Sequence, residues 1–131
     1  MRIDKQLSIF LENKPGTLAK ICEALAEKGI NLLALTVSDT VDHAVVRIVV
    51  DKPAEALHLL GASGILVVEN DVVVVDVPNR PGSLAVIAKR LADSNVNIEY
   101  AYCTAPESQS AGLLVLRARD PNRALRVLRE D

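Results

Sequence analysis

One short segment of the chain occurs twice. Residues 13–19 read NKPGTLA and residues 79–85 read NRPGSLA, 66 positions further on. The correspondence continues at apolar positions as far as Asn31 and Asn97. Packing alone explains a repeated apolar helix face, but it does not require the polar Asn and Gly positions to recur. The repeat therefore predicts two copies of one unit and a duplicated site.

The length limits how these copies can fold. The chain has 131 residues, half of them apolar, which is enough to bury one good core. A copy of roughly 65 residues would be marginal by itself. We therefore expect the copies to pack together, with a first repeat at 1–70 and a C-terminally incomplete second repeat at 71–131.

Composition excludes several classes of protein. The formal charge of −2 gives no general attraction to nucleic acid or to anionic membranes. No apolar run approaches the ~20 residues of a spanning helix, and the first residues are too charged for a signal peptide. The sequence therefore predicts a soluble cytoplasmic protein. Cys22 and Cys103 lie in unlike contexts without nearby partners, which is typical of buried free thiols.

The first copy has the spacing of a βαββαβ unit. Alternating residues predict strands, and Leu18, Ile21 and Leu25 lie at helical spacing after a proline that suits a first helical turn. The expected elements are a strand at 6–11, a helix beginning with Pro15 in its first turn and ending at Lys28 and Gly29, strands at 31–37 and 44–50 around a polar turn at 38–42, a helix at 53–60, a turn at 61–64 and a strand at 65–68.

The second copy repeats this order but stops early. The expected elements are a strand at 72–77, a helix from Pro81 to about Asp93, strands at 97–104 and 111–118, and a helix from Pro121 to about Arg129. The last strand is missing, which would leave the valine-rich strand 72–77 with an open, aggregation-prone edge. We expect the strand at 65–68, a partner chain or a further C-terminal segment to cover it, and homo-oligomers are plausible through this edge.

With these residues in view, the chain resembles tandem ACT-domain proteins, small regulatory modules that bind amino acids. The shared motif is a strand, then Asn-x-Pro-Gly-x-Leu-Ala opening a helix, then an asparagine entering the next strand, and it is present twice. The resemblance implies an α+β, ferredoxin-like βαββαβ fold repeated twice, with an antiparallel sheet and helices on one face. It also implies amino-acid sites at the junction of two units, contacted by the repeated loops.

The candidate ligand-binding residues are the two loops and the strand-entry asparagines: Asn13, Lys14, Pro15, Gly16, Thr17, Asn31, Asn79, Arg80, Pro81, Gly82, Ser83 and Asn97. A loop that enters a helix N-terminus offers unpaired N–H groups and the positive end of the helix dipole, which suits a carboxylate. Glycine lets the backbone approach a ligand closely, and asparagine amides can accept from an ammonium and donate to a carboxylate. These contacts recognise the part common to every amino acid, so they do not select a side chain.

The same residues also have a structural interpretation. Asn-x-Pro-Gly is favourable turn chemistry, and a strand-entry asparagine can satisfy loop backbone. Tyr100 and Tyr102 share one face of a predicted strand, where they fit either a pocket wall or the core. His43 and His58 lack partners in register, so we expect them at the surface.

Two other classes of function fit the sequence less well. Arginines near the C-terminus allow an RNA-binding ferredoxin-like module, but the stacking aromatics are absent, and Arg123, Arg126 and Arg129 recur as on a solvated helix face. No catalytic or metal-binding motif stands out, so we expect no catalysis, cofactor or metal. The function expected is a sensor of free amino acids that acts as a homodimer or through a separate enzyme or regulator. The alternative is a protein–protein interaction adaptor with degenerate ligand sites.

Overall fold

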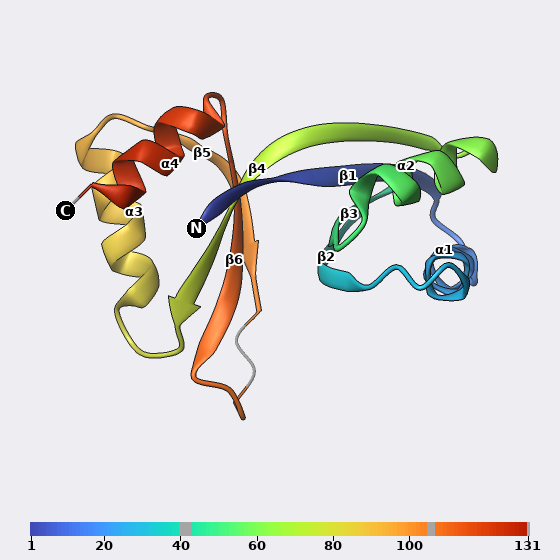
Figure 1. Cartoon of the computed structure of the whole chain (residues 1–131), viewed down its shortest axis with the longest axis horizontal. Coiled ribbons are helices and arrows are strands. Elements are labelled where there is room, and N and C mark those ends of the chain that lie inside the picture. Colours follow the sequence, from blue (N-terminus) through green and yellow to red (C-terminus); the bar gives the residue numbers. More distant parts are fainter. Residues whose placement is uncertain (40–42, 105–106, 131) are drawn as a thin grey trace. The chain divides into compact units, whose positions relative to one another are not determined.

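The computed structural model describes residues 1–39, 43–104 and 107–130. Along the chain its elements are β1 (Arg2–Glu12), α1 (Thr17–Glu27), β2 (Leu32–Asp39), β3 (His43–Val50), α2 (Pro53–Ala62), β4 (Leu66–Pro78), α3 (Ser83–Asp93), β5 (Ile98–Cys103), β6 (Ala111–Ala118) and α4 (Pro121–Arg129) (Figure 1). This order confirms the predicted α+β fold with two ferredoxin-like copies. The expected turn at 38–42 lies partly outside the described residues, at 40–42.

Contacts divide the chain into two compact units. The first unit is Lys5–Asn70, and the second unit is Met1–Asp4 together with the chain from Asp71 onward. Both boundaries fall inside a strand, because β1 and β4 each contribute residues to both units.

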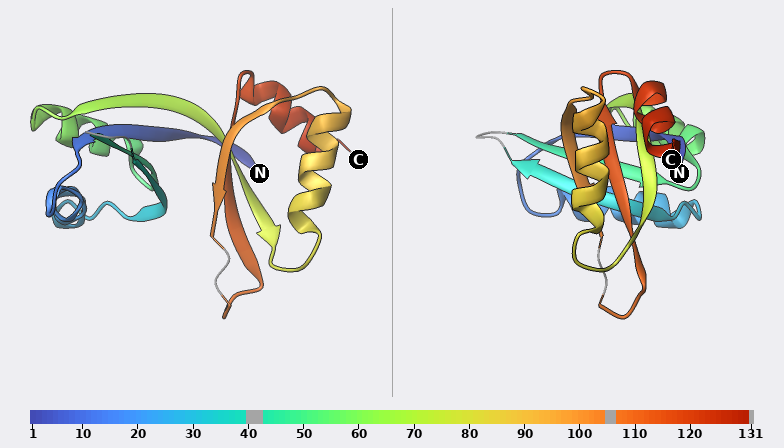
Figure 2. Two further views of the ribbon diagram at one scale, coloured as in Figure 1. Left: turned by 180° about the vertical axis from the view of Figure 1, so that it is seen from behind. Right: turned by 90° about the vertical axis from the view of Figure 1, so that its left-hand side faces the viewer.

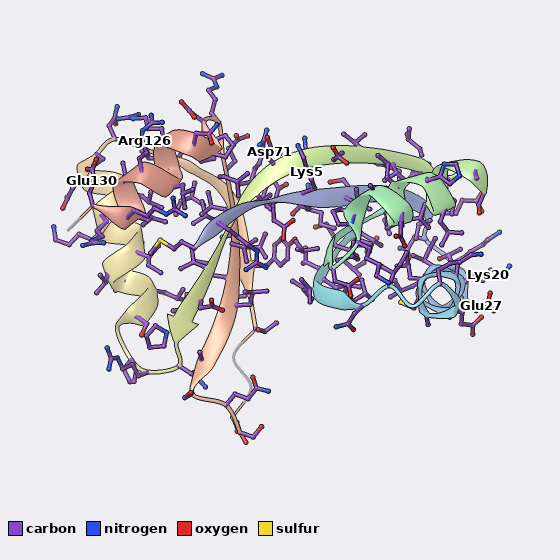
Figure 3. All side chains as sticks on the ribbon, viewed as in Figure 1. Lys5, Lys20, Glu27, Asp71, Arg126 and Glu130 are labelled. Carbon is purple, nitrogen blue, oxygen red and sulfur yellow. The ribbon has the colours of Figure 1, made fainter. Side chains whose placement is uncertain are left out.

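In the first unit, β3 lies between β1 and β2, and β4 follows β1 in the strand order. Both pairings with β3 are antiparallel, so that Leu7 and Leu35 each lie opposite Ile48. Successive side chains of a strand point to opposite faces of the sheet, so alternate residues of these strands share one face. On that face they pack against α1 and α2. The buried core comprises Leu7, Ile9, Ile21, Leu25, Ile30, Val46, Ile48, Val50, Ala56 and Leu60. On α1, Lys20 and Glu27 point away from this core (Figure 3).

The second unit repeats the arrangement with β6 between β4 and β5. Val75 lies opposite Leu114 and Ala101 opposite Leu116, again in antiparallel register. The views in Figure 2 show α3 and α4 on one side of these strands. The buried core comprises Val73, Val75, Val77, Leu91, Leu114, Leu116, Ala118, Ala124 and Leu128.

The first residues of the chain cover the open edge of the second unit. In the strand order β1 lies beside β4. Ile3 packs against the core of the second unit, and the guanidinium of Arg129 donates a 3.0 Å hydrogen bond to the carbonyl of Met1. The strand expected at 65–68 is part of β4 itself, so cover by that strand is wrong, whereas cover of the rest of β4 by a partner or a C-terminal segment stays a prediction.

Several predicted boundaries also change. The strands expected at 65–68 and 72–77 form one strand, β4, which runs through the polar residues Glu69 to Asp71. The prolines Pro15 and Pro81 precede the helices instead of occupying their first turns. The predictions for β6 and α4 are confirmed residue by residue. In the described part of the chain, no helix is long and apolar enough to cross a membrane.

Candidate functional site

The two repeated loops have the same backbone geometry. Gly16 and Gly82 immediately precede α1 and α3, and both have φ near 89° with ψ of −13° and −11°. Their carbonyls accept the first helical hydrogen bonds, from Lys20 and Val86, at 3.1 Å each. This left-handed conformation favours glycine. A Cβ added at either position would meet no described atom within 4 Å, so backbone conformation, not crowding, accounts for the repeated glycines.

Both helices begin without a side-chain cap. Within the described residues, no side chain accepts a capping hydrogen bond at α1 or α3. By contrast, the carboxylate of Asp120 caps α4 by accepting from the backbone N–H of Arg123 at 3.1 Å. The first N–H groups of a helix have no partner inside it and carry the positive end of the dipole. The N–H groups of Thr17 and Ser83 donate to the carbonyls of Lys14 and Arg80, at 3.5 and 3.4 Å, so the donors suited to an anion are those of the next residues in each helix.

The loop asparagines connect each loop to the following hairpin. The Nδ2 of Asn13 donates to Oδ1 of Asp39 at 2.7 Å. The Nδ2 of Asn79 donates to the carbonyl of Gln109 at 3.4 Å, and its backbone N–H donates to the carbonyl of Ser110 at 2.9 Å. Both amide groups thus hold loop geometry, which supports the structural interpretation for their donors.

The two loops differ in charge. In the first, Nζ of Lys14 lies 3.0 Å from Oε2 of Glu12. The hydrogen bond from Lys14 and its positive charge together lower the pKa of the Glu12 carboxyl. The second copy has Pro78 where the first has Glu12, and Arg80 forms no ion pair with any described carboxylate. The positive charge of the second loop is therefore the more available to a ligand.

A small cavity of about 90 Å³ borders the second loop. Its lining brings together three predicted residues, Asn79, Arg80 and Ser83. Cys103 and Thr104 line it from the end of β5 and were not predicted, and the other lining residues are Val77, Pro78, Leu84 and Gly112. Cys103 and Thr104 lie more than twenty positions along the chain from the loop, and no repeated residue marks them. Only strand pairing brings them near the loop.

The strand-entry asparagines lie apart from the loops of their own units. Asn31 exchanges two hydrogen bonds with Asp51: its N–H donates to Oδ1 at 2.9 Å, and its carbonyl accepts from the N–H at 3.1 Å. Asn97 lines a separate depression of about 460 Å³ with Glu99, Arg119 and Asp120. Each asparagine follows the C-terminal end of an 11-residue helix, whereas the repeated loop precedes the N-terminal end of the same helix. A helix of this length spans roughly 16 Å. Within one unit, loop and strand-entry asparagine therefore do not meet at one small ligand.

The two larger depressions have poorer chemistry for a carboxylate. In the depression around Asn97, the carboxylate of Asp120 already occupies the N-terminus of α4. The other, of about 580 Å³, lies in the first unit and is lined largely by apolar side chains such as Leu59 and Ala62. The small cavity at the second loop is therefore the better candidate.

The structure also places the tyrosines and cysteines that were singled out in the sequence. Tyr100 and Tyr102 do share a face of β5, opposite Arg117 and Val115. The prediction of buried thiols is wrong for Cys103, which is exposed at the end of β5. Cys22 is half-buried. No three His, Cys, Asp or Glu side chains gather into a metal site among residues 1–39, 43–104 and 107–130.

Comparison with known proteins gives the family. The ACT domain pair family model matches residues 1–131, the whole chain. The chain belongs to the ACT domain pair family. The resemblance described from the sequence is thereby confirmed. A search of curated proteins found no match to this ACT pair.

Solved structures agree with this assignment. Protein BT0572 from Bacteroides thetaiotaomicron is 37% identical, with a TM-score of 0.89 over 96% of the ACT pair and 86% of that chain. The ligand-free regulatory subunit of aspartate kinase from Thermus thermophilus is 21% identical, with a TM-score of 0.71 over 98% and 95%. The corresponding subunit from Thermus flavus is 22% identical, with a TM-score of 0.65 over 97% and 93%. The two Thermus structures support the fold alone.

Proposed function

We propose that this ACT pair is a regulatory module that binds a free amino acid at its repeated loops, with the second loop as the stronger site. The observation that carries the proposal is the cavity beside an uncapped helix N-terminus, with Asn79, Arg80 and Ser83 among its lining residues. The module performs no catalysis of its own and passes its signal to another protein.

The chemistry of the second loop suits an amino-acid carboxylate. The first N–H groups of α3 and the guanidinium of Arg80 donate to its two oxygens, and the hydroxyl of Ser83 adds a donor. Three charge-assisted hydrogen bonds at about 1.5–3 kcal/mol each exceed an association cost of about 4 kcal/mol or more. The net of about 0.5–5 kcal/mol corresponds to a Kd between about 0.4 M and 0.2 mM, the affinity of a weak metabolite site.

The first loop has the same backbone geometry, but its positive charge is less available to a ligand. Lys14 is held by Glu12, so a ligand carboxylate would have to compete with a carboxylate of the protein. We therefore expect the two loops to differ in affinity although their sequences are alike. The junction site implied by the sequence resemblance stays a prediction.

Calorimetric titration with the standard amino acids tests this function. We expect saturable binding of at least one amino acid, weakened about tenfold or more by Arg80→Ala because one charge-assisted hydrogen bond is lost. The matched variant Lys14→Ala, in the first loop, is expected to change the affinity of the stronger site less than twofold. Absence of binding by every amino acid tested would contradict amino-acid sensing and favour the protein–protein interaction adaptor.

A homodimer remains a prediction, now with a different physical basis. In the described strand order β2 and β5 are outermost, and outer strands are ready to pair with another chain. On β2, Leu35 and Val37 are 39% and 47% exposed. We expect light scattering to give twice the chain mass and Val37→Lys to halve it. A monomeric mass for the unaltered chain at every concentration would remove this proposal.

A further inference from the structure

An apolar groove lies beside the proposed site in the second unit. It measures about 220 Å³ and runs between α3 and strands β5 and β6. Its walls include Leu84, Ile87, Ala88, Ile98, Ala101 and Leu116. No charged side chain lines it within the part of the chain that the structure describes. The groove is therefore a place for an apolar group.

The groove adjoins the cavity at the second loop. Leu84 and Cys103 line both spaces. A molecule whose carboxylate lies beside Arg80 can therefore extend its other end past these two side chains into the groove. Each space is smaller than the roughly 300–1,000 Å³ typical of pockets for drug-sized ligands. Their size suits a ligand as small as a free amino acid.

One difference between the copies lies in the wall of this groove. Ala101 lies opposite Leu116 on β6, and Leu35 lies opposite Ile48 at the corresponding place in the first unit. The first copy thus has a leucine where the second has an alanine. In keeping with this, Ile21 on α1 is only 4% exposed, while its counterpart Ile87 on α3 is half-buried. Ala101 lines the groove, so it leaves more room there than a leucine at this position would.

We propose that the second loop selects amino acids with aliphatic side chains, such as leucine, isoleucine, valine and methionine, and binds those side chains in this groove. The proposal rests on the proposed function and adds the class of ligand to it. Burial of one aliphatic side chain corresponds to roughly 10- to 100-fold tighter binding than that of a ligand without one. A charged side chain would lose its hydration there without gaining a partner.

The first test compares ligands on the unaltered full chain by calorimetry. Leucine, isoleucine and valine are titrated against serine, aspartate and lysine under one set of conditions. We expect leucine to bind at least tenfold more tightly than serine. Tighter binding of a polar or charged amino acid would overturn the aliphatic preference while leaving amino-acid sensing intact. Absence of binding by all of them would overturn both.

The second test fills the groove with the residue of the other copy. Ala101→Leu is expected to weaken leucine binding at least tenfold and to change glycine binding less than twofold, because glycine leaves the groove empty. Leu35→Ala, the reciprocal change in the first unit, is the matched control and is expected to leave leucine binding unchanged. Circular dichroism checks that both variants are folded. Unchanged leucine affinity in a folded Ala101→Leu protein would overturn the proposal.

A third readout needs no substitution. Cys103 is exposed and lines both spaces, whereas Cys22 is half-buried on α1. Saturating leucine is expected to slow alkylation of Cys103 by iodoacetamide at least fivefold and to leave the rate at Cys22 unchanged. An unchanged rate at Cys103 under saturating leucine would show that the side chain binds elsewhere and would overturn the proposal.

Discussion

Ile3→Asp is expected to lower the free energy of unfolding by about 2–3 kcal/mol, the cost of removing a half-buried aliphatic side chain that packs on the core and placing a charge there. Ile3 packs against the core of the second unit from the segment that covers the outer side of β4. For a chain of this size the loss corresponds to a fall in Tm of roughly 10 °C. Thermal denaturation followed by circular dichroism measures it.

The control lies on the neighbouring residue. Arg2 is exposed and forms a surface ion pair with Asp4 at 3.3 Å, so Arg2→Ala is expected to change stability by about 0.5 kcal/mol or less. Ile3→Val keeps an apolar side chain and should cost about 1 kcal/mol. A Tm for Ile3→Asp equal to that of Arg2→Ala would show that the N-terminal segment does not complete the second unit.

Gly82→Val is expected to reduce amino-acid affinity at the second loop by tenfold or more. Its φ of 89° costs roughly 1–2 kcal/mol for an L-residue, and a β-branched side chain is worse still. Valine is therefore expected to force the loop into another conformation, which displaces Arg80 and Ser83. Calorimetric titration measures the affinity directly.

Two further variants test whether the loss of affinity is specific to the conformation of the second loop. Gly82→Asn is expected to bind nearly as well as the unaltered chain, because asparagine tolerates the left-handed region. Gly16→Val imposes the same strain at the first loop and should leave the stronger site unchanged. Equal losses in Gly16→Val and Gly82→Val would contradict the assignment of the stronger site to the second loop.

Local patterns predicted most of the fold. Asp120 and Pro121 mark the start of α4 by an acidic N-cap and a proline at the first helical position, and the helix forms over the predicted residues. The continuity of β4 was not predicted, since Glu69, Asn70 and Asp71 read locally as a polar break. Pairing between distant strands overrode that preference. The cover by Met1–Asp4 is likewise a long-range contact, made by residues outside the repeated segment.

The candidate site, like the fold, was predicted from the sequence only in part. The repeated motif identified the loops, and the left-handed Gly16 and Gly82 give the glycines a physical reason that the sequence did not. The contrast between Glu12 and Pro78 is visible in the sequence, but its effect on Lys14 and Arg80 depends on side-chain geometry. The contribution of Cys103 to the cavity depends on the pairing of β5 with β6.

The most direct measurement of the central claim is a two-dimensional ¹⁵N–¹H NMR titration of the full chain with the amino acid that calorimetry shows to bind most tightly. We expect the largest amide shifts at Arg80, Leu84 and Ala85, around the N-terminus of α3, with smaller shifts at Leu18 and Ala19 in the first copy. Saturable binding that leaves the amides of the second loop unmoved would contradict the assignment of the site.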